Sequence, residues 1–592
     1  MQARKVFRSA SLWGGLLFAS ICACYWVIWT RCLAQTQGHF TYALDDPYIH
    51  LAIAKNLAFH GVWGVTEYTP SSASSSPLWI LLLAPAIRVF GDSIYWPLLF
   101  GIFFSLATVL LLYVRFVRAG FVAPLAFVVV AAIFALGPLH ILPFTGMEHS
   151  LQILLDLAFG FWLLTAFARP CSTKELWIGL AITALMCLCR YESAFLIVVP
   201  FLAALWRRDW KVVGVLVLGP VLAVGGFGLY SHFAGMPPVP NSVVLKGNHP
   251  GSIAALLSRT YRFLHSESLA LSDLFVLTVL AGVALGVSGL REKTRSLQVW
   301  LWTVVAASLL HAALALVGYF YRYEAYLLVL LATVLALAVR ELYLFSWPAA
   351  VAPVSKRGWW ITIGLACIAQ VVLTPVFWFY QLGANLIVAT YVLIFIAFVV
   401  MDRGARTRGR LTRVLLGCFA TLALCFTVRD RSVAAFHDIA NGSRDIYLQQ
   451  FQMSRFVSRY YPKGRLAAND IGCVSYFTNV HLLDLVGLAN DDIRALKRSH
   501  TFSTRSLGDV IDRFKPDLVI AYPDWFVGPE SLPQTLIPVA RWVIPPVTTA
   551  AGSMVTFYAF TAEGASGMRT NLVDFQSSLP SLVKVEYVGD SR

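Results

Sequence analysis

The chain has 592 residues, of which 58% are hydrophobic and only 13% are charged. A soluble globular domain carries about 25% charged residues, so this composition excludes an ordinary soluble protein and indicates a polytopic membrane protein. The net charge is +15, yet residues 429–592 contain 17 Lys+Arg and 16 Asp+Glu. The excess therefore lies in short loops between apolar runs, which is typical of membrane topology and argues against a nucleic-acid-binding surface.

Apolar runs of about 20 residues predict about thirteen membrane spans. The basic start at the N-terminus is followed by a long apolar run, which we interpret as a retained first span and not as a cleaved signal peptide. The predicted spans cover residues 11–31, 94–114, 121–140, 148–168, 176–189, 193–206, 212–233, 271–290, 298–318, 324–343, 358–378, 382–401 and 411–428.

The apolar run 77–91 is ambiguous, because it is short and contains two prolines and Arg88. If it does not cross the membrane and the N-terminus is cytoplasmic, the basic loop clusters all fall on the cytoplasmic side, so we predict a surface helix here. The same topology places five unusual polar segments together on the outer face, which suggests one shared site. These segments are 45–48, 145–150, 189–193, 238–247 and 319–326.

After residue 428 the composition becomes that of a soluble protein. Short apolar runs alternate with amphipathic stretches such as 504–514, which predicts a small α/β domain. We therefore expect an all-α membrane domain over 1–428 and an extracytoplasmic α/β domain over 429–592.

Two adjacent acids, Asp45 and Asp46, precede Pro47 at the start of a short amphipathic segment. Proline suits the first turn of a helix, and an Asp beside it is a natural N-cap. Capping explains one of the two acids. We expect Asp46 to be the cap, which leaves Asp45 for chemistry.

Other charged residues share the predicted outer face. Glu148 and His149 begin a span, where an acid is favoured by the helix dipole and a His is either a metal ligand or a core residue. Arg190 and Glu192 form an internal ion pair or mark a phosphate site. Lys246 and Arg322 either extend toward lipid headgroups or hold a lipid phosphate. The tyrosines around Arg322 fit an interfacial belt or a sugar-stacking surface.

The sequence lacks a Walker-type loop, a dinucleotide-binding glycine motif and a serine nucleophile elbow, so it offers no visible pocket for a soluble nucleotide donor. Several segments, in order, resemble the GT-C superfamily of polytopic glycosyltransferases, in particular bacterial arabinofuranosyltransferase- and mannosyltransferase-like members. They are "LDDPYIHLAIAKNLAFHGVWGV" with "SSASSSPLWILLLAPAIRVFG", "TGMEHSLQILL", "RYESAFLIVVP", "PNSVVLK" and "NDIGCVSYFTNVHLLDLVGLAND".

The resemblance implies a polyprenyl-phosphate sugar donor and inverting transfer of the sugar to an acceptor hydroxyl of a glycan, lipid or protein. It also implies that transfer takes place on the outer face of the bacterial inner membrane. Carried over to this chain, it makes Asp45 the general base, Asp46 a cap or metal ligand, and Glu148 the second catalytic acid. The implied donor and phosphate contacts are Arg190, Asn241, Lys246, Arg322 and Tyr323.

The resemblance also leaves room for a divalent metal, Mg²⁺ or Mn²⁺, with Asp46 and His149 as candidate ligands. His149 departs from the family pattern, in which a small residue commonly follows Gly-Leu-Glu. Two other functions stay open. One is a secondary transporter that binds its coupling ion through carboxylates, although these acids lie in outer loops and not at the bilayer midplane. The other is a non-catalytic envelope-binding protein, in which the acidic pair is only a cap.

Overall fold

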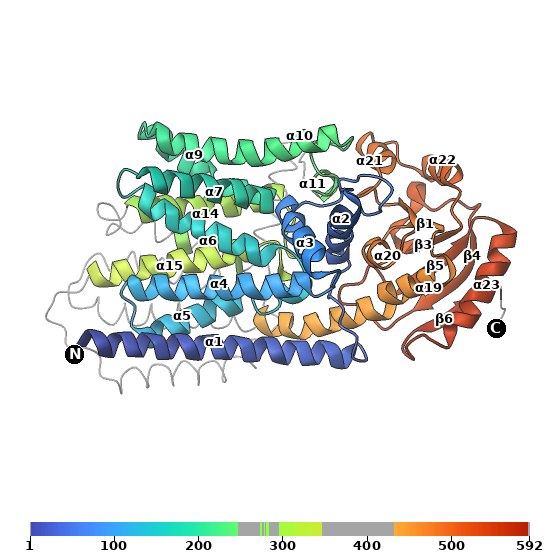
Figure 1. Ribbon diagram of the computed structural model, residues 1–592, viewed down its shortest axis with the longest axis horizontal. Coiled ribbons are helices and arrows are strands. Elements are labelled where there is room, and N and C mark those ends of the chain that lie inside the picture. The colour runs from blue at the N-terminus through green and yellow to red at the C-terminus, as the bar shows by residue number, and fades with distance from the viewer. Residues whose placement is uncertain are drawn as a thin grey trace, which may run out of the picture.

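The computed structural model describes residues 2–246, 295–345 and 431–589, with a few residues between 273 and 282. Long helices lie side by side in a bundle, and a domain with a β-sheet adjoins one end of it (Figure 1). The described bundle helices are α1 (Gln2–Gln35), α4 (Trp96–Arg118), α5 (Ala123–Leu136), α6 (His149–Ala166), α7 (Thr173–Cys189), α8 (Val198–Trp206), α9 (Trp210–Pro220), α10 (Gly226–Phe233), α14 (Arg295–Leu314) and α15 (Ala325–Phe345).

Five of the described helical stretches are long and apolar enough to cross a membrane: Ser9–Gln35, Trp96–Arg118, His149–Ala166, Trp210–Phe233 and Arg295–Leu314. The fourth joins α9 to α10 through a π-helical turn, η3 (Val221–Gly225). The helices of the bundle follow the predicted spans between residues 11 and 343. The predicted spans 358–378, 382–401 and 411–428, and most of 271–290, lie outside the described residues.

Short elements connect the bundle helices at the end nearest the sheet domain (Figure 1). One of them, α3, coincides with the ambiguous run 77–91; its 14 residues reach about 21 Å, which is too short for a 30 Å hydrocarbon core and fits a surface helix. The short elements are α2 (Asp46–His60), α3 (Pro77–Phe90), η1 (Leu142–Thr145), η2 (Tyr191–Leu196), α11 (Asn241–Lys246) and η5 (Tyr319–Tyr321).

One long helix links the bundle to the sheet domain. Residues 431–446 are helical and continue through a π-helical turn, η7 (Tyr447–Phe451), into α19 (Gln452–Tyr460). The helix begins among the bundle helices and ends against the sheet (Figure 1). The two parts of the chain are therefore joined by a continuous helix and not by a loop.

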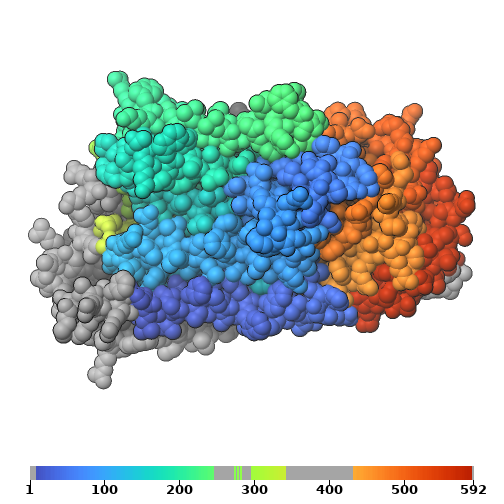
Figure 2. Space-filling model, in the orientation of Figure 1, coloured from blue at the N-terminus to red at the C-terminus, as the bar shows by residue number. Residues whose placement is uncertain are grey.

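The C-terminal domain has the mixed α/β character that the sequence predicts. Its sheet has the order β2-β1-β3-β5-β4-β6, in which β2, β1 and β3 are parallel and the remaining pairs are antiparallel. The space-filling view shows this domain packed directly against the segment between α1 and α4, in blue (Figure 2). The elements are β1 (Arg465–Ala468), α20 (Gly472–Phe477), β2 (His481–Asp484), α21 (Asp491–Arg498), α22 (Thr504–Phe514), β3 (Leu518–Ala521), η8 (Pro523–Trp525), η9 (Gly528–Glu530), β4 (Ile537–Val543), β5 (Met554–Ala559), α23 (Ala562–Gln576) and β6 (Lys584–Tyr587).

Candidate functional site

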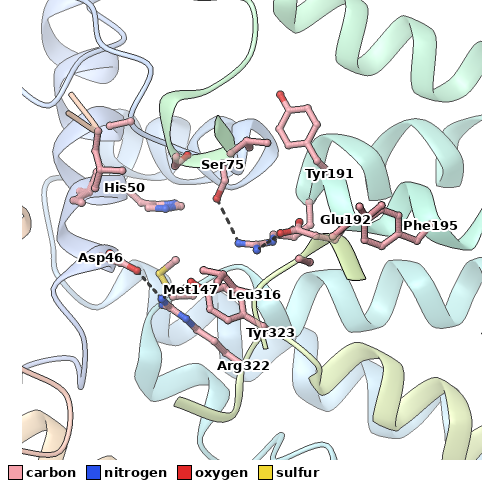
Figure 3. Close-up of a pocket in the computed structure, with 18 residues that line it drawn as sticks. Asp46, His50, Ser75, Met147, Tyr191, Glu192, Phe195, Leu316, Arg322 and Tyr323 are labelled. Atoms are coloured by element: carbon pink, nitrogen blue, oxygen red, sulfur yellow. Dashed lines mark hydrogen bonds and ion pairs between the residues drawn. The ribbon is translucent and has the colours of Figure 1, made fainter. Parts of the chain in front are cut away.

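A cavity of about 210 Å³ lies where the short connecting elements meet the C-terminal domain (Figure 3). All five polar segments that the topology placed on one face contribute to its wall; 238–247 contributes Ser242 and Val243. The C-terminal domain contributes Leu488. The charged and polar lining residues are Asp46, His50, Ser75, Arg190, Tyr191, Glu192, Ser242, Arg322 and Tyr323.

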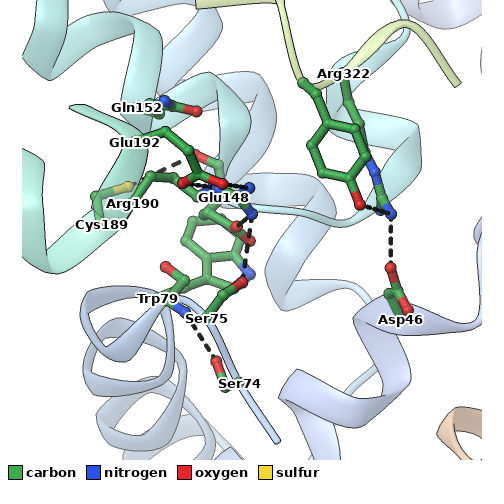
Figure 4. A network of polar contacts seen from close by, with 12 residues as sticks. Asp46, Ser74, Ser75, Trp79, Glu148, Gln152, Cys189, Arg190, Glu192 and Arg322 are labelled. Atoms are coloured by element: carbon green, nitrogen blue, oxygen red, sulfur yellow. Dashed lines mark hydrogen bonds and ion pairs between the residues drawn. The ribbon is translucent and has the colours of Figure 1, made fainter. Parts of the chain in front are cut away.

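Helix α2 carries an acid and an imidazole into this cavity. It begins at Asp46, with Pro47 next, and His50 follows one turn later on the same helix face. Asp46 Oδ2 accepts a hydrogen bond from Arg322 Nη2 at 2.7 Å (Figure 4). The expectation that Asp46 caps the helix is therefore wrong: its carboxylate is engaged by a cation across the cavity.

Asp45 occupies the N-cap position but makes no side-chain capping bond. Its carboxylate points to the C-terminal domain, where Oδ2 accepts from the Gly472 amide at 2.5 Å and Oδ1 from the Cys473 amide at 2.8 Å. Asp45 is buried and does not line the cavity. Asp46 thus faces the cavity and Asp45 lies at the N-cap position, the reverse of what the sequence led us to expect. The two side chains point in different directions because one residue step on a helix turns the side chain by about 100°.

Arg322 is held in a strained loop between η5 and α15. Phe320 and Tyr321, which precede it, have φ of 51° and 60°, in the left-handed region that side chains other than glycine rarely occupy. Its guanidinium lies over the rings of Tyr319 and Tyr323, with centroids at 5.0 and 4.9 Å. Arg322 is 1% exposed, and among the described residues its Nε and Nη1 have no hydrogen-bond partner.

A second buried ion pair fixes that loop. Glu324 accepts from the Gly318 amide at 2.9 Å through Oε2 and from Arg431 Nη2 at 2.5 Å through Oε1. Arg431 also donates to the carbonyl of Tyr321 at 3.0 Å. Arg431 belongs to the long helix that leads to the sheet, so this helix supports the loop that presents Arg322.

Arg190 is the second cation of the cavity. It donates to Glu148 Oε1 at 2.8 Å and, through Nη2 and Nε, to the two oxygens of Glu192 at 2.7 and 3.1 Å (Figure 4). Ser75 lies within 3.4 Å of Nη1. Arg190 and Glu192 therefore form the expected internal ion pair, and both also line the cavity. Glu148 is completely buried behind Arg190 and does not itself line the cavity.

The remaining predicted contacts lie elsewhere. Asn241 is 1% exposed, and its amide donates to the Leu488 carbonyl at 3.1 Å and to Asp491 Oδ1 at 3.0 Å, so it joins the two domains and does not face the cavity. Tyr323 lines the cavity, as expected for a donor contact. Lys246 ends α11, and its side chain is outside the described part.

The structure separates the two candidate metal ligands. His149 is buried beside the ring of Tyr323, and it does not line the cavity that Asp46 faces. Among the described residues, no group of three or more His, Cys, Asp or Glu side chains could hold a metal ion. The described residues thus do not gather into the expected Mg²⁺ or Mn²⁺ site, which stays a prediction.

Sequence reasoning missed His50, which lies in the quoted acidic motif at an i+4 spacing from Asp46. Its Nδ1 is 4.0 Å from Glu148 Oε2, so the buried acid lies behind both His50 and Arg190. The helical spacing was a usable signal, since it places both side chains on one face once the helix is known to start at Asp46.

Asp45 has an acidic neighbour, Asp470, at the end of β1. Burial, followed by the nearby charge of Asp45, raises the pKa of Asp470 well above its ordinary value. Burial also raises the pKa of Asp45, although hydrogen bonds from Asp470 and from the Cys473 and Gly472 amides oppose this. The raised pKa of Asp470 favours a proton shared between Asp470 and the neighbouring Asp45 carboxylate, and Gln450 donates to Asp470 Oδ2 at 2.7 Å.

This shared proton predicts a pH dependence. In the unfolded chain Asp470 loses its proton near the ordinary pKa of about 3.9. The protonated Asp470 therefore stabilises the folded protein at low pH, and this stabilisation is lost as the pH rises from about 3.9 through the raised pKa of the folded state. Asp470→Asn keeps a donor toward Asp45 and an acceptor for Gln450 without titrating. We expect the melting temperature of this variant to fall less than that of the wild type between about pH 5 and 9. Asp509→Asn, at an exposed acid of α22, should follow the wild-type curve; parallel curves for all three proteins would contradict the shared proton.

Comparisons with known proteins identify solved structures with a similar fold. Residues 442–558 match a family model described as a domain of unknown function (DUF8728). No curated protein matches the chain in sequence. A crystal structure of ArnT from Cupriavidus metallidurans bound to undecaprenyl phosphate matches with a TM-score of 0.51 and 14% identity, over 92% of this chain and 99% of that one. The apo structure of the same protein matches with a TM-score of 0.51 and 16% identity, over 94% and 99%. The predicted GT-C-like architecture is thereby confirmed at the level of the fold.

Proposed function

We propose that the protein is an inverting glycosyltransferase, which moves a hexosyl or pentosyl group from a polyprenyl-phosphate donor to an acceptor hydroxyl on the outer face of the membrane. The observation that carries this proposal is the position of Arg322. One of its N–H groups binds Asp46, and its Nε and Nη1 have no partner among the described residues. A buried guanidinium that is open on one side suits a phosphate group.

The chemistry follows from this arrangement. Asp46 takes the proton of the acceptor hydroxyl as its oxygen forms a bond to the anomeric carbon. The bond from that carbon to the phosphate oxygen breaks, and the lipid phosphate leaves with the electron pair. Arg322 and Arg190 stabilise the charge that develops on the leaving group. A phosphate is already a good leaving group, so a strong general acid is not needed.

The buried acids then have supporting roles. Glu148 and Glu192 hold Arg190 in place by three hydrogen bonds, and Glu148 lies behind the cavity wall. In this proposal Glu148 orients a phosphate-binding cation and does not receive the acceptor proton. No step passes through a metal ion.

The fold supports a lipid-linked donor, because the similar ArnT structure was determined with undecaprenyl phosphate bound. Helices α2 and α11, which contribute residues to the cavity wall, lie at the end of the bundle that faces the C-terminal domain (Figure 1). The positive-inside rule places this end outside and the N-terminus in the cytoplasm. A donor whose polyprenyl chain stays in the membrane could then present its phosphate to the cavity.

Purified protein in liposomes that contain a polyprenyl-phosphate sugar provides the test. We expect one molecule of polyprenyl phosphate to be released for each sugar transferred to an added acceptor lipid or glycan extract, as measured by mass spectrometry. Asp46→Asn protein serves as the inactive control. Uptake of free sugar without release of polyprenyl phosphate would instead support a transporter, and donor binding without turnover would support a non-catalytic binding protein.

A further inference from the structure

The strands β2, β1 and β3 are parallel, so their carboxyl ends share one edge of the sheet. The segment after β1 contacts Asp45, which lies in the segment between α1 and α4 (residues 36–95). In open α/β sheets, ligands bind in the crevice beyond these strand ends. The segments that follow the three strands contain Asp470, Leu488 and Tyr522. Helix α20, which begins just after β1, packs on α2 between the membrane bundle and the sheet (Figure 1).

Asp45 of the membrane domain occupies this crevice as a bound carboxylate would. Two consecutive amides, of Gly472 and Cys473, donate to its two oxygens, and the side chain of Asp470 is a further hydrogen-bond partner. Asp45, Gly472 and Cys473 are buried. Asp45 is separated from Gly472 by 427 positions in the sequence, so the contact is a tertiary one between the two domains.

Gly472 is required by the closeness of this contact. A Cβ atom there would overlap the main-chain oxygen of Asp45 and would lie 2.6 Å from its Oδ2. Neither neighbour is the flexible end of a long side chain, so a larger residue would have to displace the first turn of α2. That turn carries Asp46.

Independent contacts hold the same two surfaces together. Asn241 binds the loop that carries Leu488, which lines the cavity. Lys55 of α2 donates to the Tyr476 carbonyl at 3.2 Å, and Tyr68 donates to the Asn479 carbonyl at 3.0 Å. The C-terminal domain thus contacts the segment between α1 and α4 at Asp45, Lys55 and Tyr68.

We infer that the C-terminal domain, including the segment of unknown function 442–558, captures Asp45 as an internal ligand and thereby positions Asp46 against Arg322. Asp45 and Gly472 are positioning residues of the active site, and the domain crevice is occupied by the chain itself. This inference rests on the proposed function for its catalytic consequence, but the capture itself can be measured without turnover.

Gly472→Ala and Asp45→Asn test the inference from its two sides, and Gly567→Ala is the matched control. Gly567 lies in the same domain, and a Cβ there would meet nothing within 4 Å. We expect kcat to fall about 10²-fold in the two test variants, the effect of displacing a catalytic group such as Asp46 by about 1 Å. The affinity for undecaprenyl phosphate should be retained. The double variant should lose no more than the stronger single variant, because both changes break one contact.

Hydrogen exchange separates this inference from the proposed function. Asp45→Asn alters no residue of the C-terminal domain, yet it should speed amide exchange in both 46–60 and 472–477 while leaving α22 and α23 protected. If the wild-type protein shows no sugar transfer but Asp45→Asn still speeds amide exchange in these two segments, the capture of Asp45 stands and only the glycosyltransferase proposal is overturned. Unchanged exchange in these two segments, or additive losses of activity in the double variant, would overturn the capture.

Discussion

Asp46→Asn should lower kcat about 10²–10⁴-fold, the range that a positioned general base contributes. The amide keeps the size of the side chain and a partner oxygen for Arg322, but it cannot accept the proton of the acceptor hydroxyl. The affinity for undecaprenyl phosphate should not fall, since the charge of Arg322 is then less neutralised. The measurement is single-turnover transfer with saturating donor, combined with a binding assay for undecaprenyl phosphate.

The neighbouring acid provides the sharpest comparison for this prediction. Asp45→Asn is also expected to slow transfer, but through loss of docking, so only this variant should show faster hydrogen exchange in residues 472–477. Normal transfer by Asp46→Asn, together with complete loss in Asp45→Asn protein whose C-terminal domain stays docked, would return the role of base to Asp45.

The helices of the bundle and the grouping of the polar segments around one cavity were predictable from the sequence, because both depend on local patterns. Apolar runs of the right length predicted the described helices, and the distribution of Lys and Arg predicted which loops share a face. Asp46, Arg190, Arg322 and Tyr323 were among the predicted residues, and they line one cavity. The predicted α/β character of residues 429–592 likewise followed from alternating short runs.

The roles within the acidic pair were not predictable in this way. Which acid faces the cavity depends on the residue at which α2 starts, and a shift of one residue exchanges the two side chains. The partners that decide it, Gly472 and Arg322, are separated from the pair by hundreds of residues. The contact of the Asn241 amide was not predictable for the same reason, because its partner is a loop of the other domain. Such tertiary contacts leave no periodic signal in the sequence.

Arg322→Lys should lower kcat about 10²–10³-fold, as expected when a preorganised donor is removed from a developing oxyanion. Lysine keeps the positive charge but is a single point donor, and it cannot contact Asp46 and a phosphate with separate N–H groups in a fixed plane. The affinity for undecaprenyl phosphate should fall as well, which is the opposite of the expectation for Asp46→Asn.

Arg169→Lys is the matched control for this substitution. Arg169 is an exposed residue that pairs with Glu175 beside the start of α7, away from the cavity lining. Its variant should retain both kcat and affinity for the lipid phosphate. If Arg322→Lys kept wild-type affinity while Arg190→Lys lost it, the phosphate would belong on the Arg190 side of the cavity, and Arg322 would serve only to orient Asp46. The Arg322 guanidinium contacts the proposed base, Asp46, and also lines the cavity. If Arg322→Lys, which preserves the charge, loses both kcat and affinity for the lipid phosphate, then Arg322 both orients the base and binds the leaving group.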